Sequence, residues 1–180
     1  MQVNIQLSLR TQEVYQLFVR RISGDRLFIE AILHKFNIAL NHSRQQPPQA
    51  LIRYTEMRQK ITGLTQHFNS EAVRFETLLK KKKNFENKKI SYAVKFQPSI
   101  IVTNPLTIQL IEFIEIYDKL IAILKLLHLA GCFDSDEAYF GNIKHFQKVA
   151  NTMLSDLILA RATTMPNDLN AYLLEGNIKQ

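Results

Sequence analysis

The first ten residues alternate between apolar and polar side chains. The apolar positions are Val3, Ile5, Leu7 and Leu9, and the polar positions are Gln2, Asn4, Gln6, Ser8 and Arg10. Strict alternation over such a run predicts a β-strand over residues 2–10 with one buried face. The exposed face has no acid, and its amide, hydroxyl and guanidinium groups are those that bind base edges in the major groove of DNA. A solvated strand that merely covers a helical core is the alternative interpretation.

Helical spacing of apolar residues follows this strand. Thr11 can cap a short helix, and Glu13 lies in its first turn, where the helix dipole favours an acid. Ser23-Gly24-Asp25 then breaks the chain, and a second helix is predicted from about residue 26 to residue 45. Strand, short helix, glycine turn and longer helix over residues 1–45 is an order similar to the ribbon-helix-helix DNA-binding fold. An α+β domain with no role in nucleic-acid binding can show the same order.

A long apolar seam, residues 51–79, marks the middle of the chain. Pro47-Pro48 ends the second helix, and apolar residues then recur every three or four positions, which predicts one long helix over residues 48–83. Such a seam either pairs with a helix of another molecule or packs into the core of its own chain. Both interpretations stay open at the level of sequence.

The last part of the chain, residues 90–165, predicts a strand followed by two helices. Tyr92, Val94 and Phe96 alternate with polar or small residues over residues 90–97, and residues 99–102 can continue this strand. A long helix is predicted over residues 106–130. Together these elements predict one compact α+β domain over residues 1–165, mostly α-helical with short β-ribbon strands, and a polar tail over residues 166–180. The two strands either compete for one DNA-reading role or pair with each other in one sheet.

Basic residues are concentrated in the first half of the chain. Residues 1–90 contain 16 Lys and Arg against 7 Asp and Glu, whereas residues 91–180 contain 7 against 9. This asymmetry indicates one surface for a polyanion and another for packing or partners. A lysine run at a helix end is also typical of a solvated terminus. Besides the polar face of the first strand, the candidate DNA contacts are Lys80, Lys81, Lys82, Lys83, Lys88, Lys89, Lys95 and Gln97.

No motif in the sequence predicts catalysis. Cys132 is the single cysteine, the five histidines show no metal-type spacing, and no glycine-rich phosphate loop is present. We therefore expect a non-enzymatic protein with no cofactor, metal or small-molecule substrate. The N-terminus has no signal-peptide pattern, and charges interrupt the most apolar stretch, residues 106–131. These features predict a cytoplasmic protein that does not contact the membrane, and the DNA-binding interpretation adds a location at the nucleoid.

Several motifs are similar to those of AcaB-like proteins, which occur in conjugative plasmids and integrative conjugative elements. They are Asn104-Pro105-Leu106, Tyr117-Asp118-Lys119-Leu120 and His128-Leu129-Ala130-Gly131, followed by Asp134. The resemblance covers most of residues 5–160, in elements more than in identities. It implies a dimeric transcriptional activator of conjugative transfer genes with a ribbon-helix-helix character.

Two hypotheses of different classes result. In the first, the protein is a homodimer that binds promoter DNA, with a strand face reading bases while lysines and helix N-termini hold phosphates. In the second, it is a non-enzymatic interaction or structural component of a conjugative element and uses the apolar seam of residues 51–79. Only the first predicts specific DNA binding at physiological salt.

Overall fold

Helices dominate the structure. The computed structural model describes residues 2–22, 24–45, 49–83, 85 and 90–159. The elements in chain order are β1 (Val3–Gln6), α1 (Gln12–Val19), α2 (Phe28–Gln45), α3 (Gln49–Lys80), β2 (Ser99–Val102), α4 (Pro105–Leu129) and α5 (Asp136–Leu159). Within these residues the mostly helical α+β class is confirmed. The tail predicted over residues 166–180 lies outside the described residues.

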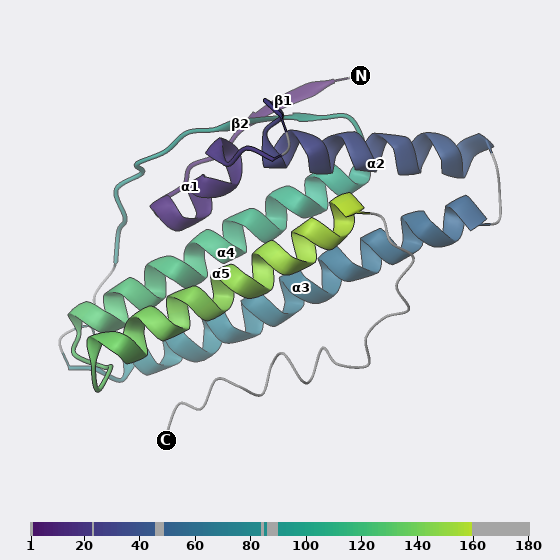
Figure 1. The fold of residues 1–180 in the computed structure, drawn as a ribbon. Coiled ribbons are helices and arrows are strands. Elements are labelled where there is room, and N and C mark those ends of the chain that lie inside the picture. Colours follow the sequence, from purple (N-terminus) through teal and green to yellow (C-terminus); the bar gives the residue numbers. More distant parts are fainter. Residues whose placement is uncertain (1, 23, 46–48, 84, 86–89, 160–180) are drawn as a thin grey trace.

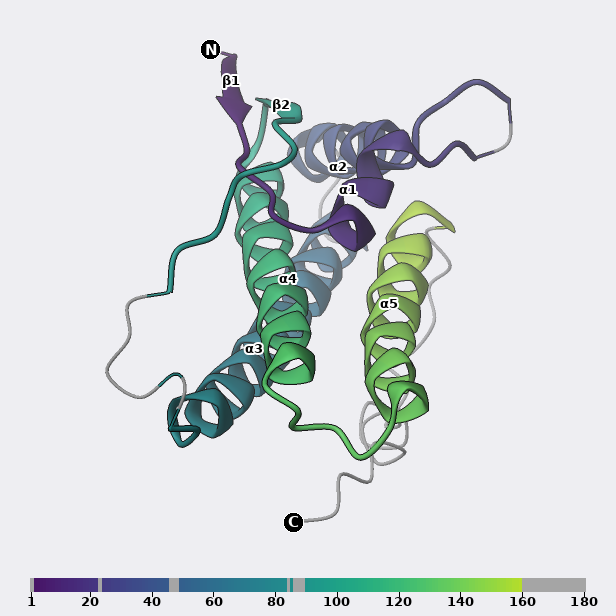
Figure 2. The same cartoon turned by 90° about the vertical axis from the view of Figure 1, so that its left-hand side faces the viewer.

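Helix α4 lies at the centre of the fold because it is apolar on nearly all sides. It contacts α1, α2, α3, α5 and β2. In Figure 1, α3 and α4 run in the same direction and α5 runs back beside them. Residues 90–98 therefore run back along the outside of the molecule before β2 leads into α4, as Figure 2 shows. None of the described helices combines the length and the apolar character that crossing a bilayer requires.

The apolar seam of α3 packs within its own chain. From Met57 to Leu79 its seam residues are at most 5% exposed. The ring of Phe68 meets the rings of Phe113 and Tyr117 on α4 edge-on, at centroid distances of 5.2 and 5.3 Å. The core interpretation of the seam is therefore confirmed for these residues. A second protein cannot use them as a docking surface without opening the bundle.

The two strands pair with each other in one antiparallel sheet. Its register places Val3 opposite Val102, Asn4 opposite Ile101, Ile5 opposite Ile100 and Gln6 opposite Ser99. A bridge between Leu9 and Phe96 continues the same register toward α1. The strand predicted over residues 90–97 is misplaced, because only Phe96 of that run pairs and the ladder uses Ser99–Val102 instead.

Proline explains why both strands are shorter than the alternation predicted. Pro98 accepts a hydrogen bond from the backbone N–H of Leu7 at 2.9 Å, but it has no N–H to return. The regular ladder of β1 therefore stops at Gln6, although Leu9 still donates to the carbonyl of Phe96 at 2.9 Å. The strand, helix and helix order of the first 45 residues is present, with Gly24 at φ +78° in the turn before α2. The ribbon itself, however, forms within one chain.

Candidate nucleic-acid interface

Polar residues of the first predicted strand and of residues 97–99 lie on one surface. Residues that face each other across an antiparallel ladder point to the same side of the sheet. The observed register pairs Asn4 with Ile101 and Gln6 with Ser99, and its continuation through the Leu9–Phe96 bridge brings Ser8 opposite Gln97. We call this surface the outer face of the ribbon, and its residues, all exposed, are Gln2, Asn4, Gln6, Ser8, Gln97, Ser99 and Ile101.

The opposite side of the ribbon closes the core. Leu7, Leu9 and Ile100 are at most 1% exposed, and Ile5 is half-buried. The pairing therefore separates an apolar inner side from an outer face that has hydrogen-bonding groups and no charge. A two-stranded ribbon fits the major groove, where amide side chains can form paired hydrogen bonds with adenine. The two strands therefore form one ribbon with a shared outer face, and not two separate candidate surfaces.

Arg10 lies at the inner end of the ribbon and is held by its own chain. Its backbone N–H donates to both carboxylate oxygens of Asp118, at 3.1 and 3.0 Å. Its guanidinium Nε is 3.8 Å from the same carboxylate, and the group covers the ring of Tyr92 at 4.9 Å from the centroid. Arg10 is therefore primarily a structural contact. Lys95, whose backbone N–H donates to the carbonyl of Leu9 at 3.0 Å, keeps an exposed side chain at this end.

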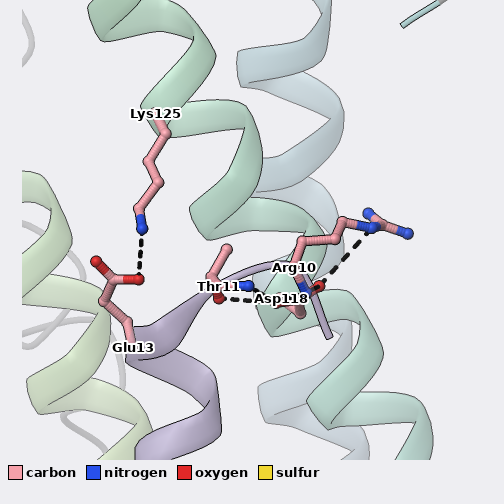
Figure 3. A network of polar contacts seen from close by, with 5 residues as sticks. All are labelled: Arg10, Thr11, Glu13, Asp118 and Lys125. Carbon is pink, nitrogen blue, oxygen red and sulfur yellow. Dashed lines mark hydrogen bonds and ion pairs between the residues drawn. The ribbon is translucent and has the colours of Figure 1, made fainter. Parts of the chain in front are cut away.

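Asp118 anchors the junction between the ribbon and α1, as Figure 3 shows. Its side chain is 2% exposed and accepts hydrogen bonds from the backbone N–H of Thr11 at 2.9 Å and from the Thr11 hydroxyl at 2.7 Å. Thr11 does occupy the N-cap position of α1, but its side chain accepts no hydrogen bond from the first turn, and its hydroxyl donates to Asp118. The prediction that Thr11 caps α1 is therefore right about its position and wrong about its hydrogen bond. The buried carboxylate instead ties α4 to the first residues of α1.

A second ion pair holds α1 on α4. Lys125 Nζ lies 2.7 Å from Glu13 Oε2, and both side chains are partly exposed. Figure 3 places this pair beside the Asp118 contacts, on the same two helices. Since the ribbon leads directly into α1, the two contacts limit how the ribbon can tilt relative to α4.

The lysine cluster, Lys80, Lys81, Lys82 and Lys83, follows the end of α3. Lys80 Nζ lies 3.2 Å from Glu76 Oε1, and Lys119 Nζ of α4 lies 2.9 Å from Glu76 Oε2. Hydrogen bonds from Lys119 and Lys80 lower the pKa of Glu76. Lys81, Lys82 and Lys83 have exposed side chains. Lys88 and Lys89 lie outside the described residues.

Two consecutive residues of α4 connect the lysine cluster with the inner end of the ribbon. Asp118 pairs with Arg10, and Lys119 pairs with Glu76, which also binds Lys80. Beside Arg10, burial raises the pKa of Tyr92, and the charge of Arg10 opposes that rise. The outer face of the ribbon is thus followed along the molecule by Lys95 and then by the lysine cluster.

The other residues behind the resemblance have structural roles. Tyr117 is 1% exposed and packs in the core. At the end of α4, Cys132 N–H donates to the carbonyl of Leu127 and Gly131 N–H to that of His128, each at 2.9 Å. With Gly131 at φ +65°, this is a Schellman motif, which satisfies the last carbonyls of a helix. The glycine is required there by its backbone conformation.

Sequence reasoning missed Asp118 as the residue that positions the ribbon. The available signal was an acid with the apolar neighbours Ile114, Ile121 and Ala122 one helical turn away, since a buried charge requires partners. Its partners, however, are more than 100 residues away in the sequence. In the described part of the chain, no three His, Cys, Asp or Glu side chains gather in a way that could hold a metal ion.

Comparison with known proteins identifies the fold. No protein-family model and no curated protein sequence matches this chain. Its structure is similar to the crystal structure of selenomethionine-containing AcaB from uropathogenic E. coli, with a TM-score of 0.61 and 12% sequence identity. The match covers 98% of this chain and 99% of that one. The chain therefore has a distant AcaB-like fold over nearly its whole length.

Proposed function

We propose that this protein is a DNA-binding transcriptional regulator, an activator of conjugative transfer genes that binds promoter DNA as a homodimer. The proposal includes a location in the bacterial cytoplasm at the nucleoid and no catalysis, cofactor, small-molecule substrate or membrane contact. One observation carries it: the polar positions of two distant segments form a single exposed, acid-free face on a two-stranded ribbon. The distant AcaB-like fold supports a regulatory role.

In this proposal the ribbon enters the major groove with its outer face toward the bases. Asn4, Gln6 and Gln97 supply amides, which can donate and accept at the same base edge. Lys95 and the lysine cluster contact phosphates as point charges, which positions the protein without reading sequence. The neutral centre thus supplies specificity and the cations at one end supply affinity.

The Asp118 contacts give the interface a fixed geometry. A reading surface is effective only when its supporting contacts hold it in place before binding. Asp118 and the Glu13–Lys125 pair join the ribbon end and α1 to α4, the most buried helix of the fold. Less conformational entropy is then lost when the ribbon binds.

The proposal includes a homodimer related by a two-fold axis, because a dimer of this kind reads a DNA site with matching two-fold symmetry. In the described residues the sheet has two strands. Each copy would place its own two-stranded ribbon in the major groove, since a four-stranded sheet formed by pairing the β1 edges would be too wide for it.

The test compares specific with random DNA. Duplexes enriched from a random pool by the wild-type protein are titrated with Gln6→Ala and Gln97→Ala, and with Gln66→Ala, an exposed glutamine on α3, as the matched control. Each lost bidentate contact should cost about 1–3 kcal/mol on the enriched duplex and little on random DNA. The control should bind like the wild type. If the wild type retards no duplex at physiological salt, the proposal is wrong. An interaction component would then have to use a surface other than the seam of α3, which is buried from Met57 to Leu79.

A further inference from the structure

We infer that Ile101 and Asn4 together read an A·T base pair, with Ile101 against the thymine methyl group and the Asn4 amide on the adenine edge. The inference rests on the proposed function and assigns the class of base pair that the centre of the ribbon selects. It also adds a reading residue, Ile101, that is apolar and that the polar pattern of the sequence did not reveal.

Ile101 is an exception on the outer face of the ribbon. Its side chain is 54% exposed, whereas Ile100 beside it is 1% exposed and belongs to the core. Alternation assigns the inner side of β2 to Ile100 and Val102, so the core gains nothing from an aliphatic residue at position 101. Threonine would satisfy the preference of a strand for branched side chains while remaining compatible with water. A large apolar group in the middle of a polar, exposed face is therefore unexplained by folding.

The partner of Ile101 across the ladder supplies the complementary chemistry. Asn4 is directly opposite Ile101 in the register, which brings their Cβ atoms to about 5 Å on one side of the sheet. An exposed amide and an exposed aliphatic group are thus adjacent. In the major groove an A·T pair presents adenine N7 and N6, which suit an asparagine, together with the thymine methyl, which suits an apolar contact. A G·C pair offers no methyl group.

Charge around the pair favours DNA as the occupant of this face. The outer face contains no acid, and Lys95 and the lysine cluster follow it along the molecule. A second copy of the chain would present the same cations to it. The observed charge pattern complements a polyanion better than it complements another copy.

The experiment removes the methyl group from the DNA and the side chain from the protein. In the enriched duplex each thymine is replaced in turn by deoxyuridine, which lacks only the methyl group. We expect one position at which this replacement weakens wild-type binding about fourfold, the factor for burying one methyl-sized group. Ile101→Ala should bind the normal duplex several-fold more weakly and should lose the difference between thymine and deoxyuridine at that position.

Leu129→Ala is the matched control. Leu129 is an aliphatic residue that is 78% exposed, and it lies at the end of α4, away from the ribbon. This variant should retain the full thymine dependence. Wild-type binding that is specific but indifferent to every deoxyuridine overturns the inference and leaves the proposed function intact. The inference is also overturned, with the proposed function intact, if Ile101→Ala still distinguishes thymine from deoxyuridine. A variant that binds DNA like the wild type but sediments differently would overturn it as well and would assign Ile101 to a dimer contact. Absence of any DNA binding overturns both.

Discussion

Replacing Asp118 by asparagine tests whether this residue anchors the ribbon. The substitution preserves the shape of the side chain and removes its charge. Oδ1 of Asp118 accepts from the backbone N–H of Arg10 at 3.1 Å and from the backbone N–H and hydroxyl of Thr11 at 2.9 and 2.7 Å. An amide can keep an oxygen at that position, but its NH2 group then replaces the oxygen that faces the Arg10 N–H and guanidinium.

The magnitude follows from the two buried bonds that Thr11 donates. Hydrogen bonds to charged groups stabilise proteins by about 1.5–3 kcal/mol, whereas neutral ones contribute about 0.5–1.5 kcal/mol. Losing the charge across two buried bonds should therefore lower the free energy of unfolding by about 2–3 kcal/mol. Thr11→Val removes the hydroxyl donor alone, which bonds to the charged carboxylate, and should cost about 1.5–3 kcal/mol. Because both variants disturb the same contact, their effects should not add.

Urea unfolding of the two single variants and the double variant measures these values. Glu115→Gln, an exposed acid on the same helix, is the control and should change stability by less than about 0.5 kcal/mol. Hydrogen exchange supplies a local readout, since the amides of Leu7 and Leu9, which bond to Pro98 and Phe96, should exchange faster in Asp118→Asn. The anchoring role is refuted if Asp118→Asn is as stable as Glu115→Gln, or if the coupling with Thr11 is absent.

Four further predictions concern charge, pH and assembly. Replacing Lys81, Lys82 and Lys83 by alanine should weaken binding to all DNA alike, and each lost phosphate contact should make the slope of log affinity against log salt shallower by about 0.9; an unchanged slope would assign the lysines to a solvated helix end. Hydrogen bonds from Lys119 and Lys80 lower the pKa of Glu76, so the stability that Glu76 contributes is present at pH values above the ordinary pKa of a glutamate and is lost as pH falls. In pH-dependent unfolding, Glu76→Gln should therefore lose less stability in acid than the wild type, by a difference of less than about 1 kcal/mol. Burial lowers the pKa of His67, so the folded state resists protonation and the free energy of unfolding should fall as pH drops below about 6.5. This fall should be less steep in His67→Gln, and equal slopes of stability against pH in the two proteins would contradict the prediction. Sedimentation at micromolar concentration should show a dimer, and a monomer there would contradict the proposed homodimer.

Local pattern was sufficient for the helices. The long helix predicted over residues 48–83 is α3 at Gln49–Lys80, and the helix predicted over residues 106–130 is α4 at Pro105–Leu129. Helical periodicity and the Asn104 cap, whose side chain accepts from the Thr107 N–H, are properties of neighbouring residues. These features can therefore be recognised in the sequence without knowledge of the tertiary structure. Alternation likewise identified Leu7 and Leu9 as buried and Ser8 between them as exposed, but the prediction was wrong for Val3, which is 43% exposed at the outer end of the strand.

Tertiary structure decided which surfaces meet, because that depends on contacts between residues far apart in the chain. Periodicity shows that the seam of α3 is buried, but only the packing of Phe68 against Phe113 and Tyr117 shows that its own α4 covers it. Pro98, which has no N–H, moved the second strand to Ser99–Val102, and the long-range register then placed Gln97 opposite Ser8. The candidate reading face is the result of that register. The sequence determined which side chains are polar and exposed, and the antiparallel pairing alone determined that they lie side by side.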